Sequence, residues 1–136
     1  MTLFVDTSVW SLAFRRDAPP QVPAVQALNG AITTGDTIVT TGLVIQELLQ
    51  GFAGPKARER IVDQFSALPL IVPNRDDHVR AAELRNRCRR KGIQVGTVDV
   101  LLAELCIRFD LTMLTTDRDF AQMAAQSSLK LWKGAG

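Results

Sequence analysis

The stretch that decides the fold is 3-LFVDTSVW-10, in which three apolar residues are followed by an acid and then by a helical pattern. Leu3 to Val5 do not alternate with polar residues, and this is typical of a parallel strand buried on both faces. In such sheets, ligand sites form beyond the carboxyl ends of the strands, which is where Asp6 stands. The stretch therefore predicts an α/β fold and a candidate site residue together.

Similar short apolar runs recur along the chain between longer helical patterns. They are rich in β-branched and large apolar residues, so we predict strands at 3–5, 37–41, 70–72, 112–115 and 129–132. Helices are predicted at 8–15, 22–31, 43–51, 56–67, 76–91, 98–109 and 120–125. The alternation predicts a central parallel sheet of about five strands flanked by helices on both faces.

Length and composition indicate one domain over residues 1–136, since a chain that is 46% apolar can form a continuous core. The net charge of +2 permits a polyanionic partner without demanding one. Cys88 and Cys106 have no metal-site spacing, which favours reduced thiols in a cytoplasmic protein. The N-terminus lacks a basic region and meets Asp6 early, so we expect no signal peptide, and no apolar run approaches the roughly 20 residues of a membrane span.

Acids follow the ends of the first and fourth predicted strands. Asp6 either caps the helix that begins after it or belongs to a site, and the two roles are compatible. Asp117 and Asp119 in 115-TTDRDF-120 could each cap the next helix. One acid is enough to cap a helix. Capping therefore does not explain why this segment carries two acids.

Asp99 lies on a helix that is apolar nearly all round. At about 100° per residue, the polar arc of 98–108 holds only Glu104 and Arg108, and Asp99 falls on the apolar side. An inward acid needs a partner, because a desolvated carboxylate otherwise becomes neutral or costs several kcal/mol. The competing interpretation places Asp99 in the first turn, where it favours the helix dipole.

Glu47 and His78 are less informative by themselves. Glu47 sits at the flank of an apolar helical stripe, a common place for a solvated glutamate. His78 is the only histidine, and we predict that it lies at the surface. A single surface histidine excludes histidine relays and HExxH zinc sites. Phosphate-binding glycine loops are also absent from the sequence. Several acids in one pocket would repel one another unless a hard cation such as Mg²⁺ or Mn²⁺ held them, and such ions support phosphodiester hydrolysis.

Four segments resemble, in order, the motifs of PIN-domain ribonucleases, and specifically the VapC-like toxins of bacterial toxin–antitoxin pairs. They are LFVDTSVW at 3–10, VIQELLQG at 44–51, TVDVLLA at 97–103 and LTTDRDF at 114–120. The one departure is Val100 and Leu101 after Asp99, where many relatives carry other apolar residues. The resemblance covers nearly the whole chain and implies a single PIN domain with a parallel sheet.

The resemblance also implies which residues act. Asp6, Glu47, Asp99 and Asp117 would hold Mg²⁺ or Mn²⁺ and catalyse RNA hydrolysis, with supporting roles for Thr7, Ser8, Thr115 and Asp119. It further implies a VapB-like antitoxin that occupies the active-site cleft, and a homodimer. Possible RNA contacts come from basic residues on two predicted helices, because such groups bind phosphates; these are Arg15, Arg16, Arg85 and Arg89. A solvated helix face is the competing interpretation of that charge.

Two other functions fit parts of the pattern. A PIN-like fold could bind RNA or a partner without catalysis, although a binding module has no reason to keep four clustered acids. A phospho-receiver domain would need an acid at the end of its third strand, and 70-LIVP-73 has none. The pattern of acids therefore favours a metal-dependent nuclease, and the resemblance implies that its substrate is RNA.

Overall fold

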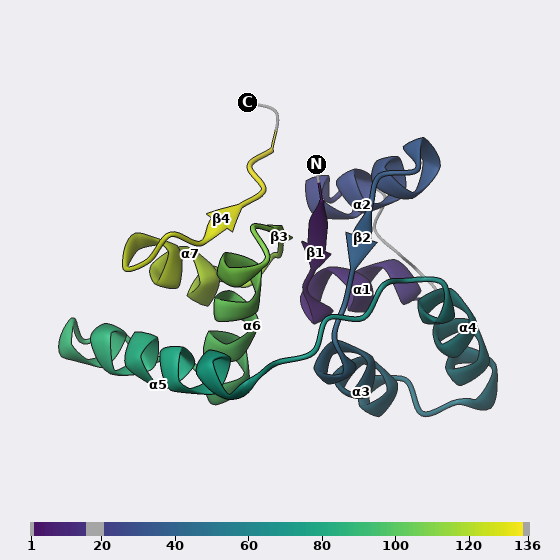
Figure 1. The fold of residues 1–136 in the computed structure, drawn as a ribbon. Coiled ribbons are helices and arrows are strands. Elements are labelled where there is room, and N and C mark those ends of the chain that lie inside the picture. The colour runs from purple at the N-terminus through teal and green to yellow at the C-terminus, as the bar shows by residue number, and fades with distance from the viewer. Residues whose placement is uncertain (1, 16–20, 135–136) are drawn as a thin grey trace.

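The strands form one parallel sheet at the centre of the chain (Figure 1). The structure, a computed structural model, describes residues 2–15 and 21–134. Within that part the strand order is β2-β1-β3-β4. The strands are β1 (Leu3–Val5), β2 (Ile38–Val39), β3 (Thr112–Leu114) and β4 (Lys130–Leu131).

The helices surround this sheet on two sides. They are α1 (Thr7–Phe14), α2 (Pro23–Thr34), α3 (Gly42–Gly51), α4 (Pro55–Ser66), α5 (Arg75–Arg90), α6 (Thr97–Arg108) and α7 (Arg118–Ala125). In Figure 1, α1 to α4 lie on one side of the sheet and α5 to α7 on the other. Every predicted helix is present, with ends shifted by three residues at most, so the predicted α/β class is confirmed.

The predicted strand at 70–72 is wrong. This segment meets the sheet at a single bridge between Thr40 and Leu70. Pro69 and Pro73 flank the segment, and proline cannot donate a hydrogen bond to a ladder. Two of its three apolar side chains are exposed, Leu70 at 52% and Val72 at 65%, and only Ile71 packs against the core. The described sheet therefore has four strands rather than about five.

Strand β1 lies in the middle of the sheet, and its position explains its apolar sequence. Leu3 pairs with Ile38 of β2 and with Thr112 of β3. All three residues of β1 are buried, as expected for a strand with neighbours on both edges and helices on both faces. Because β1 and β3 are parallel and in register from Leu3 to Val5, Asp6 and Thr115 come directly after the two strand ends.

Helix α6 is buried along most of its length, as its sequence predicts. Residues from Val100 to Cys106 are all buried. The polar arc is also covered, because α5 packs along it: Glu104 is only 7% exposed. At the end of the arc, Arg108 donates to the buried carboxylate of Asp77 at 2.8 Å. The polar side of α6 thus faces a second helix rather than water.

Two further expectations concern the thiols and membrane spans. Cys88 and Cys106 are both buried and form no disulfide. Among the described residues, no helix combines the length and the hydropathy that crossing a membrane requires.

Candidate metal centre

Asp6 caps α1 and is held through one carboxylate oxygen. Its Oδ2 accepts hydrogen bonds from Ser8 N at 3.4 Å, Ser8 Oγ at 2.8 Å and Thr115 Oγ1 at 2.9 Å. The side chain is only 5% exposed. No described residue donates to Oδ1, so this second oxygen is left for another ligand. Asp6 therefore caps α1, and its free Oδ1 keeps this role compatible with a place in a site.

The same hydroxyl groups connect two turns of the chain. Ser8 Oγ accepts the Thr116 N–H at 3.1 Å, and Thr115 Oγ1 accepts the Asp117 N–H at 3.0 Å. Ser8 lies in the first turn of α1, which follows β1, whereas Thr115 to Asp117 follow β3. These bonds fix Asp6 and Asp117 relative to each other, because each turn is bonded to the other through a side chain.

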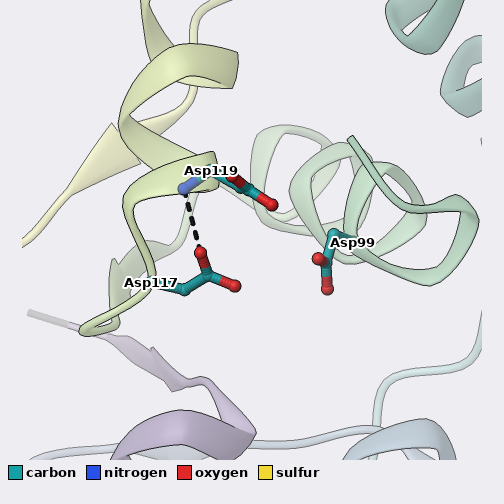
Figure 2. Close-up of side chains that lie close together, drawn as sticks. All are labelled: Asp99, Asp117 and Asp119. Atoms are coloured by element: carbon teal, nitrogen blue, oxygen red, sulfur yellow. Dashed lines mark hydrogen bonds between the residues drawn. The ribbon is translucent and has the colours of Figure 1, made fainter. Parts of the chain in front are cut away.

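Three aspartates form the tightest acidic group in the described part of the chain. Asp99, Asp117 and Asp119 each offer a carboxylate oxygen, and these oxygens all lie within 4.8 Å of one another. Figure 2 shows the three carboxylates around a common space, with Asp117 and Asp119 coming from the start of α7 and Asp99 from α6. Asp117 also caps α7 by accepting the Asp119 N–H at 2.9 Å.

Asp99 lies in the first turn of α6 and has a strongly shifted pKa. The N-cap of α6 is Gly96, and a Cβ placed on Gly96 would lie 3.6 Å from Asp99 Oδ2, an ordinary van der Waals contact. Burial, followed by the charges of neighbouring carboxylates, raises the pKa of Asp99 to about 6. Those carboxylates belong to Asp6, Asp117, Glu47 and Asp119. The inward acid expected from the helical projection therefore lies among like charges.

Glu47 approaches the group from α3. It is exposed, as its place at the flank of the helix predicts, and its Oε1 accepts a hydrogen bond from Thr7 Oγ1 at 3.1 Å. Its charge contributes to the raised pKa of Asp99. Four separate parts of the chain thus bring their acids toward one place.

The grouping differs in one respect from the expected quartet. Asp119 belongs to the tightest group, whereas Asp6 and Glu47 are further members that act on Asp99 through their charges. The sequence signal for Asp119 was the second acid of 115-TTDRDF-120, which a single helix cap does not explain.

The donors suit a hard divalent cation. Every candidate ligand atom is a carboxylate or hydroxyl oxygen, and oxygen ligands are what Mg²⁺ and Mn²⁺ prefer. Burial and then the charges of the neighbouring acids raise the pKa of Asp99, and a cation among these acids would offset their repulsion. The residues present therefore fit such an ion.

The basic candidates are not members of this acidic group. Arg15 is exposed at the end of α1, and Arg16 lies outside the described residues. Arg85 and Arg89 are on α5 and line one groove with residues 93–95. His78 is exposed on α5, as predicted.

Comparison of this chain with known proteins identifies the family to which it is similar. The profile of the PIN domain matches residues 3–126. A curated relative named Ribonuclease VapC23, from Mycobacterium tuberculosis, is 38% identical over 69 residues, which are 51% of this chain and 52% of the relative. The matched region thus spans about half the length of that relative.

Solved structures share the fold at low sequence identity. VapBC2 from Rickettsia felis, bound to a DNA fragment from its promoter, is 23% identical with a TM-score of 0.74, over 99% of this chain and 100% of that chain. VapC20 from Mycobacterium tuberculosis, a toxin that cleaves the sarcin–ricin loop, is 18% identical with a TM-score of 0.70, over 90% and 94% of the chains.

Proposed function

Because this chain belongs to the PIN domain family, we propose that it is a metal-dependent endoribonuclease whose active site is the acidic group around Asp99. The observation that carries the proposal is the convergence of three aspartate carboxylates within 4.8 Å. Two further acids, Asp6 and Glu47, raise the pKa of Asp99 from other elements, after burial as the first cause. A cluster of like charges is unfavourable without a cation, which supports a catalytic rather than a structural role.

The ligands of the ion would be Asp6, Glu47, Asp99 and Asp117, with Asp119 as a further acid. When bound, Mg²⁺ or Mn²⁺ supplies an activated water and stabilises charge on the oxygens of a phosphodiester. Ser8 and Thr115 donate to Oδ2 of Asp6, which leaves Oδ1 without a donor among the described residues and available to the ion.

The experiment is an RNA cleavage assay with purified protein. The wild-type protein should cleave single-stranded RNA with Mg²⁺ and lose activity in EDTA. Asp99→Asn and Asp6→Asn should each lower the rate by at least about 100-fold while the fold is kept. Asp36→Asn, an exposed acid outside the group, is the matched control. Full activity in both site variants would exclude this site, and tight RNA binding without any cleavage would instead support a binding module.

The names of the relatives suggest a biological setting. We propose that the chain is the toxin of a toxin–antitoxin pair, and that a VapB-like antitoxin occupies the cleft at the acidic group. The expected result is growth arrest on expression in cells, which co-expression of the antitoxin relieves. Mapping of RNA 5′ ends after induction would identify the substrate. Because the proposed substrate is cellular RNA, we also propose a cytoplasmic location.

We also propose that the chain forms a homodimer. The supporting surface is a mainly apolar groove of about 300 Å³ between α3, α5 and α6, which includes Leu43, Ala82 and Val98. Ala82→Glu should give a monomer in sedimentation, whereas Ala121→Glu on exposed α7 should not. A dimer that persists in Ala82→Glu would place the contact elsewhere.

A further inference from the structure

A groove with two arginines lies beside the segment that leads into α6. It has a volume of about 250 Å³ and is lined by Arg85 and Arg89 of α5 and by Ile93, Gln94 and Val95. Within the described ranges, neither arginine forms an ion pair with a carboxylate, whereas Arg108 and Lys130 do. The two guanidinium charges of the groove are therefore not neutralised by the protein.

Arg85 has a fixed position in this groove. Its Nε donates to the main-chain oxygen of Val95 at 2.9 Å, and the side chain is half-buried. That bond uses only one of the five N–H groups of a guanidinium, so the terminal nitrogens remain as donors. A guanidinium held in this way loses less side-chain entropy on binding a phosphate than a free one would.

The groove is close to the acidic group. Val95 directly precedes Gly96, and a Cβ placed on Gly96 would lie 3.6 Å from Asp99 Oδ2. Adding the Cα–Cβ bond and the roughly 3.8 Å between neighbouring Cα atoms places the Cα of Val95, a lining residue of the groove, within about 9 Å of Asp99 Oδ2. An RNA strand with one phosphodiester at the acidic group would have its adjacent phosphates in this region.

We propose that Arg85 and Arg89 bind the RNA backbone phosphates that lie on one side of the cleaved bond. The inference rests on the proposed ribonuclease function and extends it to how the substrate is held. Guanidinium groups bind phosphate oxygens in a bidentate manner, and such contacts fix the position of a strand without reading its bases. These two arginines would therefore contribute affinity for any RNA sequence.

The test measures binding of a fluorescein-labelled, single-stranded RNA of mixed sequence in EDTA, which prevents cleavage. Arg89→Gln should weaken RNA binding by about fivefold. It should also make the fall of the log binding constant with log salt concentration less steep, by about 0.7 in the slope. Arg85→Gln should act in the same direction. Arg75→Gln is the matched control, since it removes the same charge from the same helix about 20 Å away and should change affinity by less than about twofold.

Two outcomes would overturn the inference. One is an equal loss of affinity in Arg75→Gln and Arg89→Gln, which would indicate only general attraction. The other is unchanged RNA affinity together with weaker binding of a protein partner, which would assign the groove to an acidic protein segment.

Steady-state cleavage with Mg²⁺ separates this inference from the proposed function. If the wild type cleaves RNA and Arg89→Gln raises KM at unchanged kcat, both hold. If the wild type cleaves RNA and Arg89→Gln leaves KM unchanged, only the groove assignment fails. If the wild type does not cleave RNA although the arginines control its binding, the ribonuclease function fails.

Discussion

Ser8 Oγ donates a hydrogen bond to Asp6 Oδ2 at 2.8 Å, and the same hydroxyl accepts the Thr116 N–H at 3.1 Å. A side chain from the first turn of α1 thereby joins the end of β1 to the turn after β3. Thr115 Oγ1 adds a second bond to Oδ2 at 2.9 Å. Because both hydroxyls use Oδ2, the orientation of the Asp6 carboxylate is fixed before any ligand binds.

Removing the Ser8 hydroxyl should weaken cation binding. In Ser8→Ala, Asp6 keeps only the Thr115 bond and the weak bond from its own turn, and Thr116 N–H loses its acceptor. We expect Mn²⁺ affinity, measured by calorimetry, to fall by about tenfold, as is usual when a group that orients a metal ligand is lost. Ser11→Ala, on the same helix, is the control. Equal Mn²⁺ affinity in Ser8→Ala and wild type would show that Ser8 does not orient Asp6.

Asp99 should make the cation-free protein less stable as pH rises. Burial and the surrounding carboxylates raise its pKa from 3.8 to about 6, so the folded state binds the proton more tightly than the unfolded state. The stabilisation is complete below pH 3.8 and is lost as pH rises through 6. Discounted for solvent screening, the loss is about 1–2 kcal/mol at neutral pH.

Urea denaturation in EDTA at pH 4 and pH 7 measures this effect. Asp99→Asn cannot ionise, so its free energy of unfolding should exceed that of the wild type by about 1–2 kcal/mol at pH 7 and match it near pH 4. Saturating Mg²⁺ should remove the difference by stabilising the wild type. A variant that is less stable than the wild type at pH 7 would contradict the prediction.

Much of the site follows from local sequence patterns. Asp6 and Asp117 were predicted from their positions after strand ends, and both do stand there as helix caps. Asp99 was predicted from the helical projection, because one buried face of one helix determines where its side chain points. The positions of these residues in the fold were predictable because each depends on a single element and its immediate boundary.

Other features depend on contacts between distant segments, and the sequence did not predict them. Residues 70–72 have a strand-like composition, but the segment lies between two prolines at the sheet edge and pairs at one bridge only. Asp119 was predicted only as a supporting residue, because the local sequence does not show that α7 brings it beside Asp99. The burial of Glu104 likewise requires knowing that α5 covers its side of α6.

Glu47 is the acid that depended most on family resemblance, and its role can be isolated by one charge-removing substitution. Glu47→Gln keeps an oxygen that can accept the bond from Thr7 Oγ1, so stability should change by less than about 0.5 kcal/mol. Loss of the charge should lower Mn²⁺ affinity by at least about tenfold and lower RNA cleavage in parallel. Glu59→Gln, an exposed acid of α4, should change neither quantity. Unchanged Mn²⁺ affinity in Glu47→Gln would exclude Glu47 from the site.

The ion pair between Arg108 and Asp77 should be important for stability and not for catalysis. Arg108 Nε and Nη2 donate to the two Asp77 carboxylate oxygens at 2.8 and 2.9 Å, and Nη2 also donates to the Val72 oxygen at 3.2 Å. Asp77 is only 1% exposed. Burial raises its pKa, but the hydrogen bonds from Arg108 and from Asn74 outweigh burial and lower it overall.

Arg108→Met would leave the Asp77 carboxylate buried without its cation. We expect a loss of about 3–5 kcal/mol in the free energy of unfolding, measured with urea at pH 7. Lys130→Met removes one partner of the Lys130–Asp110 ion pair, whose side chains are 52% and 87% exposed, and should cost less than about 1 kcal/mol. RNA cleavage per folded molecule should stay unchanged in both variants, because neither residue belongs to the acidic group. A loss below about 1 kcal/mol in Arg108→Met would mean that water replaces the guanidinium at Asp77.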